Sequence, residues 1–345
     1  MLRRTLHVVL FLVALVGTAA AIRSVDHLPF WSWARPRLAW LQHHAAEFDV
    51  MFFGSSRVHY GIVPKQFDDR LGELGHAVRS CNAGLSGARP HDTNAVVSWL
   101  VGQRPARLRL AVVELHSWSR PMAEVNWMTD QEVESHVPGE WVRRVRSMWI
   151  STNPTWTRCE QLYGLTVHTL ANLFRIGQGP RIAADLLNPT RGEAARERAV
   201  ADAGYTDVSS SKAESLKKAS QEWRDNQARR EALLRRTQGE LPADQRGGFD
   251  VASAKALAAE LRSAGVQVVF LVMPSFAGNF VGRDGVAELA ASEVVLELDL
   301  PAANPQLFVF DQWFDQSHMT RSGAEAFSRR LAEVMVEKAA KLLPR

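Results

Sequence analysis

Two short segments near opposite ends of the chain carry the residue types of nucleophilic catalysis. Ser56 lies in the sequence Gly54-Ser-Ser-Arg57, and His318 follows Asp315 by three residues. Each segment follows an apolar run, and a side chain on a sharp turn after a buried strand is exposed. If both runs belong to one parallel sheet, we expect Ser56 to attack an acyl carbonyl, His318 to take its proton and Asp315 to orient the imidazole ring.

The apolar runs of the chain predict a parallel sheet. Five of them have the length and composition of buried strands: Phe48–Phe53, Ala77–Cys81, Leu108–Leu115, Val266–Met273 and Leu307–Phe310. Helical patterns separate most of these runs, and this alternation indicates an α/β fold with helices on both faces of the sheet. Such sheets bind ligands at the carboxyl ends of their strands, where both segments fall.

Proline and glycine mark the helix boundaries. We expect helices at Pro64–Leu74, His91–Gly102, Val251–Ala264 and Thr320–Leu343. Proline is favoured at the start of a helix, as at Pro64, and glycine just after its end, as at Gly265. These helices are expected to cover the two faces of the sheet.

The two segments and a third one resemble sequence blocks of the SGNH (GDSL-type) hydrolase superfamily. Gly54-Ser55-Ser56 matches the Gly-Asp-Ser of the first block, with Ser56 in the nucleophile position and Ser55 in place of the usual Asp. Asn82-Ala-Gly-Leu-Ser-Gly87 matches the Asn-Ala-x-x-Ser-Gly of the second block and puts Gly87 in the oxyanion-hole position. The resemblance covers roughly residues 45–120 and 248–342.

The last block of the superfamily matches as well, but the third departs from the pattern. Asp315, His318 and Gly323 fit the Asp-x-x-His sequence and the glycine that follows it. After the strand predicted at 108–115, the family usually has Gly-x-Asn-Asp. This chain has Glu114-Leu-His-Ser-Trp118 instead, so a tryptophan falls where the oxyanion asparagine should be.

The resemblance implies an oxyanion hole made from the backbone N–H groups of Ser56 and Gly87. Because the asparagine of the third block is missing, the sequence does not identify the third donor of the oxyanion hole. Ser117, the indole N–H of Trp118, or His116 could replace it, because each can donate a hydrogen bond. There are two alternatives. Another part of the chain could supply the donor, or the site could be a weak one that accepts the acyl group of one specific partner.

The base that serves Ser56 is expected to be His318, because it belongs to the matching block and follows the last predicted strand. His59 is close to Ser56 in sequence and is a weaker alternative. A purely structural role for His318, bonded to Asp315 at the start of a helix, is a further alternative. Arg57 could bind an acidic substrate group such as a uronate or a phosphate, or form a salt bridge with Asp92 or Glu114.

The form Gly-Ser-Ser-Arg, together with an apolar N-terminus, is similar to a membrane-tethered branch of the superfamily. That branch includes proteins that assist O-acetylation of alginate-like polysaccharides or D-alanylation of teichoic acid. The resemblance implies a flavodoxin-like three-layer sandwich and a serine esterase or O-acyltransferase that acts on glycan esters, with an integral-membrane acyltransferase as a natural partner. A non-catalytic scaffold in a polysaccharide modification or export assembly is the alternative, and a plain secreted esterase is a third.

The N-terminal segment has the pattern of a secretory signal. Arg3 and Arg4 precede an apolar stretch from Leu6 to Ile22, and Ala19-Ala-Ala21 is a conceivable cleavage site. The stretch is also just long enough to span a bilayer. We expect residues 1–25 to be an uncleaved signal-anchor with a cytoplasmic N-terminus, which places the rest of the chain in a periplasm or cell envelope.

The middle of the chain lacks the strand pattern. We expect an SGNH-like domain at 45–342 that contains a helical insertion at 119–247, because a structureless connection of that length is rare. Helical patterns appear at Trp141–Ile150, Cys159–Ile176 and Lys212–Arg236. The insertion is expected to cap the active-site face.

Composition excludes some functions and leaves others open. The 345 residues carry a net charge of +4 and no basic stripe, so nucleic-acid binding is not expected. No cysteine, histidine or acid cluster has metal-ligand spacing, and we expect neither a metal nor a cofactor. Cys81 and Cys159 could form a disulfide, although Cys81 fits a small core residue better. The 11 tryptophans fit a sugar cleft, helix packing or a membrane interface.

Overall fold

The computed structural model describes residues 2–25, 34–115, 133–134, 136, 141–150, 155–179, 187, 201–211, 213–238, 251–277 and 282–344. The chain forms two compact units. One consists of Met1–Ala39 and Pro121–Ala194, and the other of Trp40–Arg120 and Ala195–Arg345. The first is called the helical unit below, and the second the α/β unit.

A sheet of five parallel strands forms the centre of the α/β unit. The strands are β1 (Val50–Phe53), β2 (Ser80–Asn82), β3 (Leu110–Glu114), β4 (Gln267–Val272) and β5 (Val295–Glu297). Their order in the sheet is β2-β1-β3-β4-β5, and each neighbouring pair is parallel. This is the order of a flavodoxin-like doubly wound fold, so the predicted fold class is confirmed.

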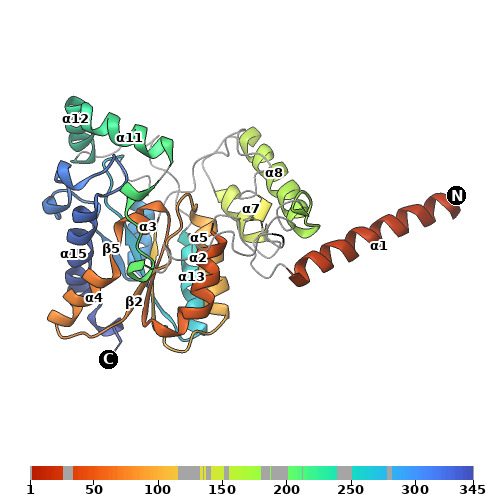
Figure 1. Cartoon of the computed structure of the whole chain (residues 1–345), viewed down its shortest axis with the longest axis horizontal. Coiled ribbons are helices and arrows are strands. Elements are labelled where there is room, and N and C mark those ends of the chain that lie inside the picture. The colour runs from red at the N-terminus through yellow and green to blue at the C-terminus, as the bar shows by residue number, and fades with distance from the viewer. Residues whose placement is uncertain are drawn as a thin grey trace. The chain divides into compact units, whose positions relative to one another are not determined.

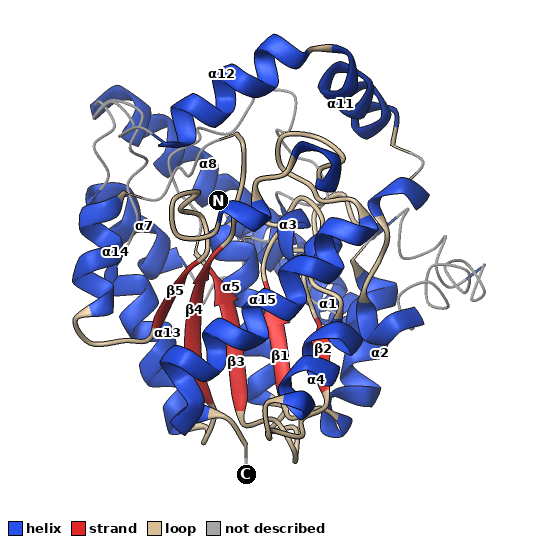
Figure 2. Ribbon diagram, turned by 90° about the vertical axis from the view of Figure 1, so that its left-hand side faces the viewer, coloured by secondary structure: helices blue, strands red, loops and turns tan. Residues whose placement is uncertain are grey.

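Helices pack on both faces of this sheet. Figure 2 shows α4 (Pro64–Glu73) and α15 (Arg321–Ala339) in front of the strands, with α5 (Pro90–Gly102) and α13 (Val251–Ser263) behind them. Successive strand residues point to opposite faces, and all four residues of β1 are buried. Strands buried on both sides are nearly continuous apolar runs, which is why the sequence predicted them so clearly.

The predicted helices are confirmed with small shifts at their ends. α4, α5, α13 and α15 correspond to the four helices expected from the sequence. Pro64 and Pro90 lie in the first turns of α4 and α5, where a missing backbone N–H costs nothing. The short helix α3 (Ser56–Gly61) and α14 (Arg283–Ala290) were not predicted.

The prediction of a fifth strand at Leu307–Phe310 is wrong. Pro305–Leu307 and Phe310–Gln312 form 3₁₀ turns, and the edge of the sheet beside β4 is taken by β5. Leu307 and Phe308 of this run are buried in another way, whereas Val309 is exposed. Phe308 packs edge-on against Phe276 at 5.4 Å, and the indole N–H of Trp313 donates to the carbonyl of Leu307 at 2.9 Å. An aromatic cluster, and not a strand ladder, therefore explains the hydrophobicity of this run.

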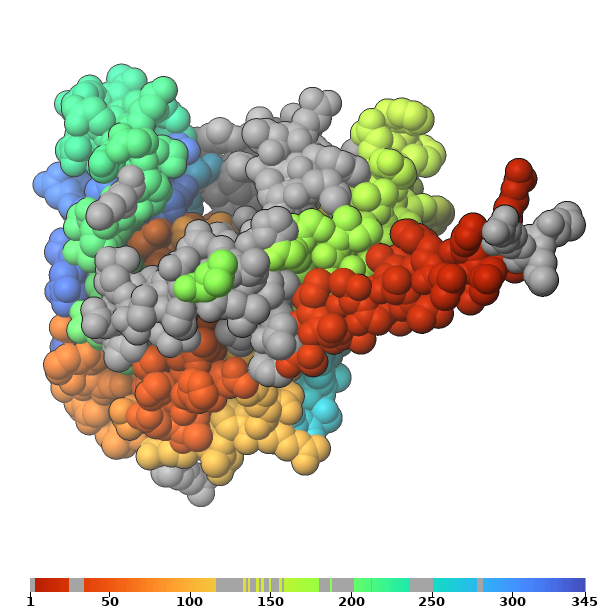
Figure 3. All heavy atoms as spheres, turned by 45° about the vertical axis from the view of Figure 1, so that its right-hand side comes forward, coloured from red at the N-terminus to blue at the C-terminus, as the bar shows by residue number. Residues whose placement is uncertain are grey.

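Part of the predicted insertion belongs to the α/β unit. Helices α11 (Glu214–Asp225) and α12 (Gln227–Gln238) lie within it, and Figure 3 shows their teal atoms against the blue atoms of the C-terminal segment. Trp223 of α11 is buried against Phe276 and Phe310. Tyr205 is buried in the same core. Residues 121–194 belong to the helical unit.

The helical unit contains α1 (Leu2–Val25), α7 (Trp141–Ile150) and α8 (Thr155–Leu173), which are labelled in Figure 1. Helix α2 (Arg35–His44) begins in this unit and continues into the α/β unit from Trp40 onward. Residues Arg4–Ser24 of α1 are long and apolar enough to cross a membrane, by length and composition. Among the described residues this is the one helix with that property. The predicted helices at 141–150 and 159–176 are confirmed.

Candidate active site

The chain turns sharply between β1 and α3, and Ser56 is the first residue of that helix. Ser55 caps the helix, and its hydroxyl accepts the backbone N–H of Arg57 at 3.3 Å. Gly54 makes the turn sterically feasible, because a Cβ there would lie 2.5 Å from Oε2 of Glu114. The N–H groups of a helix's first turn have no partners inside the helix, and the oxyanion role of the Ser56 N–H stays a prediction.

A buried carboxylate fastens this turn to the neighbouring strand. Glu114 ends β3, and its side chain is fully buried. Its Oε2 accepts the backbone N–H of Ser55 at 2.6 Å, while Oε1 lies 2.7 Å from Nε of Arg57. Bonds to ionised groups are about twice as strong as neutral ones. Glu114 therefore fixes the residues on both sides of Ser56.

The far end of α3 is fastened by Asn82, the last residue of β2. Its Nδ2 donates to the carbonyls of Val58 and Ile62, both at 2.7 Å, and its Oδ1 accepts the N–H of Gly84 at 3.0 Å. Carbonyls at the end of a helix need such partners, because the helix itself supplies none. The asparagine of the second sequence block thus holds the helix that presents Ser56.

Asp315 and His318 form a tight turn that precedes α15. One carboxylate oxygen of Asp315, Oδ1, accepts the backbone N–H groups of Ser317 at 2.7 Å and of His318 at 2.9 Å. The other, Oδ2, lies 2.8 Å from Nδ1 of His318. One oxygen builds the turn and the other orients the ring, so the spacing of three residues is a geometric requirement here.

The structure brings Ser56, His318 and Asp315 together. Nε2 of His318 lies 2.8 Å from Oγ of Ser56. Because a carboxylate only accepts hydrogen bonds, the proton of a neutral imidazole sits on Nδ1, and the lone pair of Nε2 faces the serine hydroxyl. The pairing matches the arrangement in which a serine hydroxyl is activated by a histidine base.

Neighbouring side chains hold His318 in this position. The ring of Tyr60, on α3, stands edge-on to the imidazole with 5.5 Å between the ring centroids. Behind the turn, the hydroxyl of Ser275 and the N–H of Ala277 both donate to the carbonyl of Gln316, at 3.2 and 3.0 Å. The segment after β4 therefore supports the histidine turn.

Gly323 lies in the first turn of α15 for a steric reason. A Cβ at this position would overlap the carbonyl oxygen of Gln312 and lie 3.0 Å from its carbonyl carbon. The carbonyl of Gln312 also accepts the N–H of Thr320 at 2.9 Å. The glycine thus lets the helix approach the start of the loop that carries Asp315 and His318.

The position of Ser56 in the sheet is that of a ligand site in doubly wound folds. β1 pairs with β2 on one side and with β3 on the other, so the strand order reverses beside it. Such a switch point leaves a crevice at the carboxyl ends of the strands, where ligands bind. Ser56 follows the carboxyl end of β1, and Glu114 closes that of β3.

The other predicted site residues have mixed outcomes. Gly87 lies in the turn between β2 and α5 with φ of +75°, a conformation that favours glycine, and its oxyanion role stays a prediction. Arg57 forms the salt bridge with Glu114, one of its two predicted partners, and its substrate contact stays a prediction. Ser117 and Trp118 lie outside the described residues, as does His116.

His59, the weaker alternative for the base, is engaged elsewhere. Its Nδ1 lies 3.0 Å from the carbonyl of Gly84. The cysteines are both free, with Cys81 buried and Cys159 exposed. Of the tryptophans near the N-terminus, Trp40 packs against His44 at 4.9 Å and is buried, while Trp31 and Trp33 lie outside the described residues.

Sequence reasoning missed the supporting residues around the triad. Glu114 was noted only as a partner for Arg57, and Asn82 only as part of a motif. A charged residue at the end of a buried apolar run was the available signal for Glu114, because buried charges require partners. Tyr60 carried no signal in the sequence.

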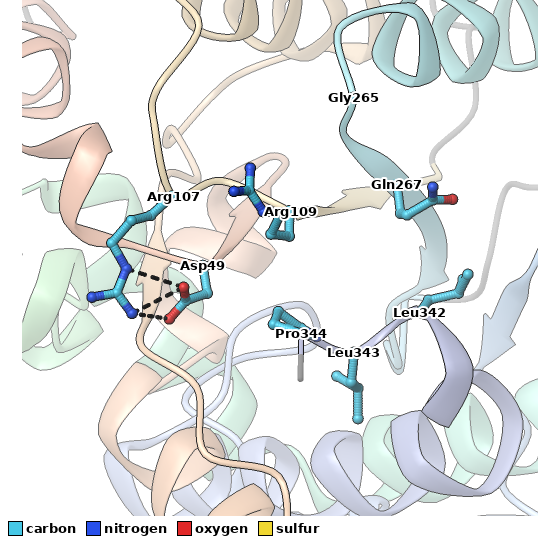
Figure 4. A pocket seen from close by; sticks show the side chains of 8 residues that line it. All are labelled: Asp49, Arg107, Arg109, Gly265, Gln267, Leu342, Leu343 and Pro344. Carbon is cyan, nitrogen blue, oxygen red and sulfur yellow. Dashed lines mark hydrogen bonds and ion pairs between the residues drawn. The ribbon is translucent and has the colours of Figure 1, made fainter.

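A hollow lies at the amino ends of the strands, opposite to the end that carries Ser56. Its volume is about 490 Å³, and Asp49, Arg109 and Gln267 line it near the amino ends of β1, β3 and β4 (Figure 4). Asp49 is bound by Arg107 through bonds of 2.9 to 3.1 Å. The lining contains no serine, cysteine or histidine, and its one carboxylate, that of Asp49, is the one paired with Arg107.

Comparison with models of known protein families gives no match to this chain, and comparison with curated protein sequences gives none either.

Proposed function

We propose that the protein is an SGNH-like acyl esterase or O-acyltransferase that acts on esters of envelope or exported glycans. The observation that carries this proposal is the chain of 2.8 Å contacts from Ser56 through His318 to Asp315 at the switch point of the sheet. The matching sequence blocks support the same assignment.

The proposed reaction has two steps. In the first, Oγ of Ser56 attacks the ester carbonyl while Nε2 of His318 takes the hydroxyl proton. The tetrahedral oxyanion is held by the N–H groups of Ser56 and Gly87, and it collapses as the alcohol leaves with the proton from His318. In the second, water or an acceptor hydroxyl gives its proton to His318 and attacks the acyl-serine. The bond to Oγ of Ser56 then breaks, His318 returns the proton to that oxygen, and the acid or new ester leaves.

The apolar helix α1 supports a site of action at a membrane. A single N-terminal anchor would hold the α/β unit outside the cytoplasm, where exported glycans carry their acyl groups. An integral-membrane acyltransferase is the proposed partner for the transferase form of the reaction. Whether water or a glycan hydroxyl accepts the acyl group then depends on that partner.

The experiment is acetyl release from p-nitrophenyl acetate by the full chain in detergent, beside Ser56→Ala and His318→Ala. We expect the wild type to turn over and each variant to lose about 10²–10⁴ in kcat, the usual contribution of a positioned base. Equal rates for all three proteins would contradict the proposal.

A non-catalytic scaffold is the second candidate function. It is favoured by the third block, where β3 ends in Glu114 and the glutamate is already committed to Ser55 and Arg57. A scaffold would bind an oligosaccharide without reacting with an ester. Oligosaccharide binding that survives Ser56→Ala, with no turnover by the wild type, is the result that would favour it.

A further inference from the structure

The outer face of α8 is apolar although it is exposed. Trp156, Tyr163 and Leu170 recur every seven residues, which places them on one side of the helix, and Cys159 and Leu173 lie on the same side. Trp156 is 73% exposed and Tyr163 65% exposed. These five residues are called the outer face of α8 below. An aromatic and aliphatic stripe of this kind normally packs against something apolar.

This exposure is not a sign of a poorly packed unit. The opposite side of α8 is buried, including Leu165, His168 and Asn172. Nδ2 of Asn172 donates to the carbonyl of Val133 at 3.0 Å. The helical unit thus has an interior of its own, and the outer face of α8 remains outside it.

Exposed apolar side chains are concentrated in the helical unit. Outside α1, the described residues of this unit include eight large exposed apolar side chains: Val142, Trp149, Trp156, Tyr163, Leu170, Leu173, Ile176 and Leu187. The described residues of the larger α/β unit include two, Leu300 and Val309. Trp149 belongs to α7, which packs against α8. The unit that is rich in such side chains is the one that contains α1.

A specific contact relates α8 to the end of the apolar segment of α1. Nη2 of Arg23 donates to the carbonyls of Asn172 and Leu173, both at 3.1 Å. Arg23 lies at the carboxyl end of the apolar segment, where a basic residue of a spanning helix reaches the membrane surface. If α1 spans a bilayer, the carboxyl end of α8 lies at the level at which α1 leaves it.

We propose that the outer face of α8, together with Trp149, lies in the interfacial layer of the phospholipid bilayer that α1 spans. An interfacial helix buries its apolar face at the boundary of headgroups and acyl chains. Tryptophan and tyrosine prefer this layer, because their rings are apolar and their N–H and O–H groups stay hydrated. Glu160, which is also exposed, remains at the level of the headgroups.

The chain offers its own probe site for a test. Cys159 is exposed on the outer face of α8, whereas Cys81 is fully buried and protected from labelling. The full-length protein is labelled at Cys159 with the environment-sensitive dye NBD and inserted into phosphatidylcholine nanodiscs. The control carries the dye at Lys65→Cys, an exposed site on α4, in a Cys159→Ser background.

We expect the dye at Cys159 to emit at shorter wavelength than the control. Lipids with a nitroxide on the upper acyl chain should quench it several-fold more strongly, and aqueous iodide should quench it less. Tyr163→Glu with Leu170→Glu should reduce the lipid quenching without changing the circular dichroism spectrum, since both sites are exposed. Because the first measurement uses the native cysteine, its result does not depend on whether this variant folds.

Two results would overturn the proposal. Emission and iodide quenching equal to those of the Lys65→Cys control would place the outer face of α8 in water. A short emission wavelength without quenching by nitroxide lipids would place it against protein, either the α/β unit or a partner chain. Both results are independent of the proposed reaction at Ser56.

Discussion

The backbone N–H of Ser55 donates to Oε2 of Glu114 across 2.6 Å, and this bond joins the turn that carries Ser56 to the neighbouring strand. The same carboxylate pairs with Arg57 at 2.7 Å. Ser56 stands between these two anchored residues, so its hydroxyl is presented to His318 by a turn that is held on both sides. Reactive serines require this kind of support, because small misplacements of a reacting atom cost large factors in rate.

Replacing Glu114 with alanine should impair both stability and activity. The change leaves Arg57 without its counter-charge and the N–H of Ser55 without its acceptor. Removing one partner of a buried pair costs about 3 kcal/mol in the free energy of unfolding. We expect Glu114→Ala to lower the midpoint of denaturant unfolding and to lower kcat for p-nitrophenyl acetate.

The matched control is Glu73→Ala, which removes a carboxylate that pairs with Arg70 and Arg329 at the surface. Exposed ion pairs contribute little to stability, so this variant should resemble the wild type. A Glu114→Ala protein as stable and as active as Glu73→Ala would show that the buried carboxylate does not support the site.

Asp315→Asn should reduce the chemical step without disrupting the fold. The amide keeps an oxygen that can accept the N–H groups of Ser317 and His318, so the turn should persist. Its NH₂ group cannot stabilise an imidazolium, and it favours the wrong ring tautomer. A change of this kind costs about 10⁴ in kcat in serine proteases. Steady-state kinetics should show a loss in kcat with little change in KM, and a pure KM effect would argue against the assigned role.

Gly323→Ala should disturb the histidine turn through the backbone. The new methyl group would overlap the carbonyl of Gln312. The backbone at Gln312 cannot move without also moving the loop that leads to Asp315. Overpacking of this kind costs about 1–3 kcal/mol. The control is Gly72→Ala, in helix α4, where a Cβ meets nothing within 4 Å. That substitution should stabilise the protein, because alanine is the better helix former.

Thermal unfolding and ester turnover measured on both glycine variants would check this contrast. The prediction is a lower midpoint and reduced kcat for Gly323→Ala beside a midpoint at or above wild type for Gly72→Ala. If the two variants behave alike, the close approach at Gly323 has no mechanical role.

Asp68 should make the protein less stable as the pH rises. It lies on α4, and its Oδ2 accepts the N–H of Ser80 at 3.0 Å. Burial disfavours the ionised form and raises its pKa from 3.8 to about 6, and Asp69 and Asp49 repel the charge further. The folded protein thus holds this proton more tightly than the unfolded chain. The stability that the protonated Asp68 contributes is lost as the pH rises from about 4 to about 6. Above that window, the buried charge lowers the free energy of unfolding by a constant amount.

Asp68→Asn removes that penalty. We expect the variant to exceed the wild type by about 1–2 kcal/mol at neutral pH and to match it near pH 4. Guanidinium unfolding of both proteins across this range isolates Asp68, because the other titrating groups are common to both. A difference that is the same at every pH would assign the effect to packing instead of ionisation.

The fold could largely be predicted because buried parallel strands are continuous apolar runs. β1, β3 and β4 stand out for this reason, and α4 and α5 are marked by Pro64 and Pro90. β5 escaped notice because it is three residues long and ends in Glu297. The apolar run at 307–310 misled for the opposite reason, since Phe308 and Phe310 pack into an aromatic cluster and not into a sheet.

Only part of the site could be predicted. Ser56, Asp315 and His318 were chosen by residue type and spacing, and the structure brings their side chains together. The contacts that hold them depend on residues distant in sequence, such as Glu114 against Ser55 and Ser275 against Gln316. The local sequence pattern contains no information about such pairs, because they meet only when the chain folds into this order of strands.

The proposed role of Ser56 is tested most directly by labelling the full-length protein with a fluorophosphonate, followed by mapping of the modified peptide. We expect one adduct on Ser56, which Ser56→Ala abolishes and His318→Ala slows by about 10²-fold or more. Ser55→Ala, a change of the adjacent serine, should still be labelled. A wild-type protein that forms no adduct, or a Ser56→Ala protein labelled as fast as the wild type, would contradict the claim that Ser56 is an activated nucleophile.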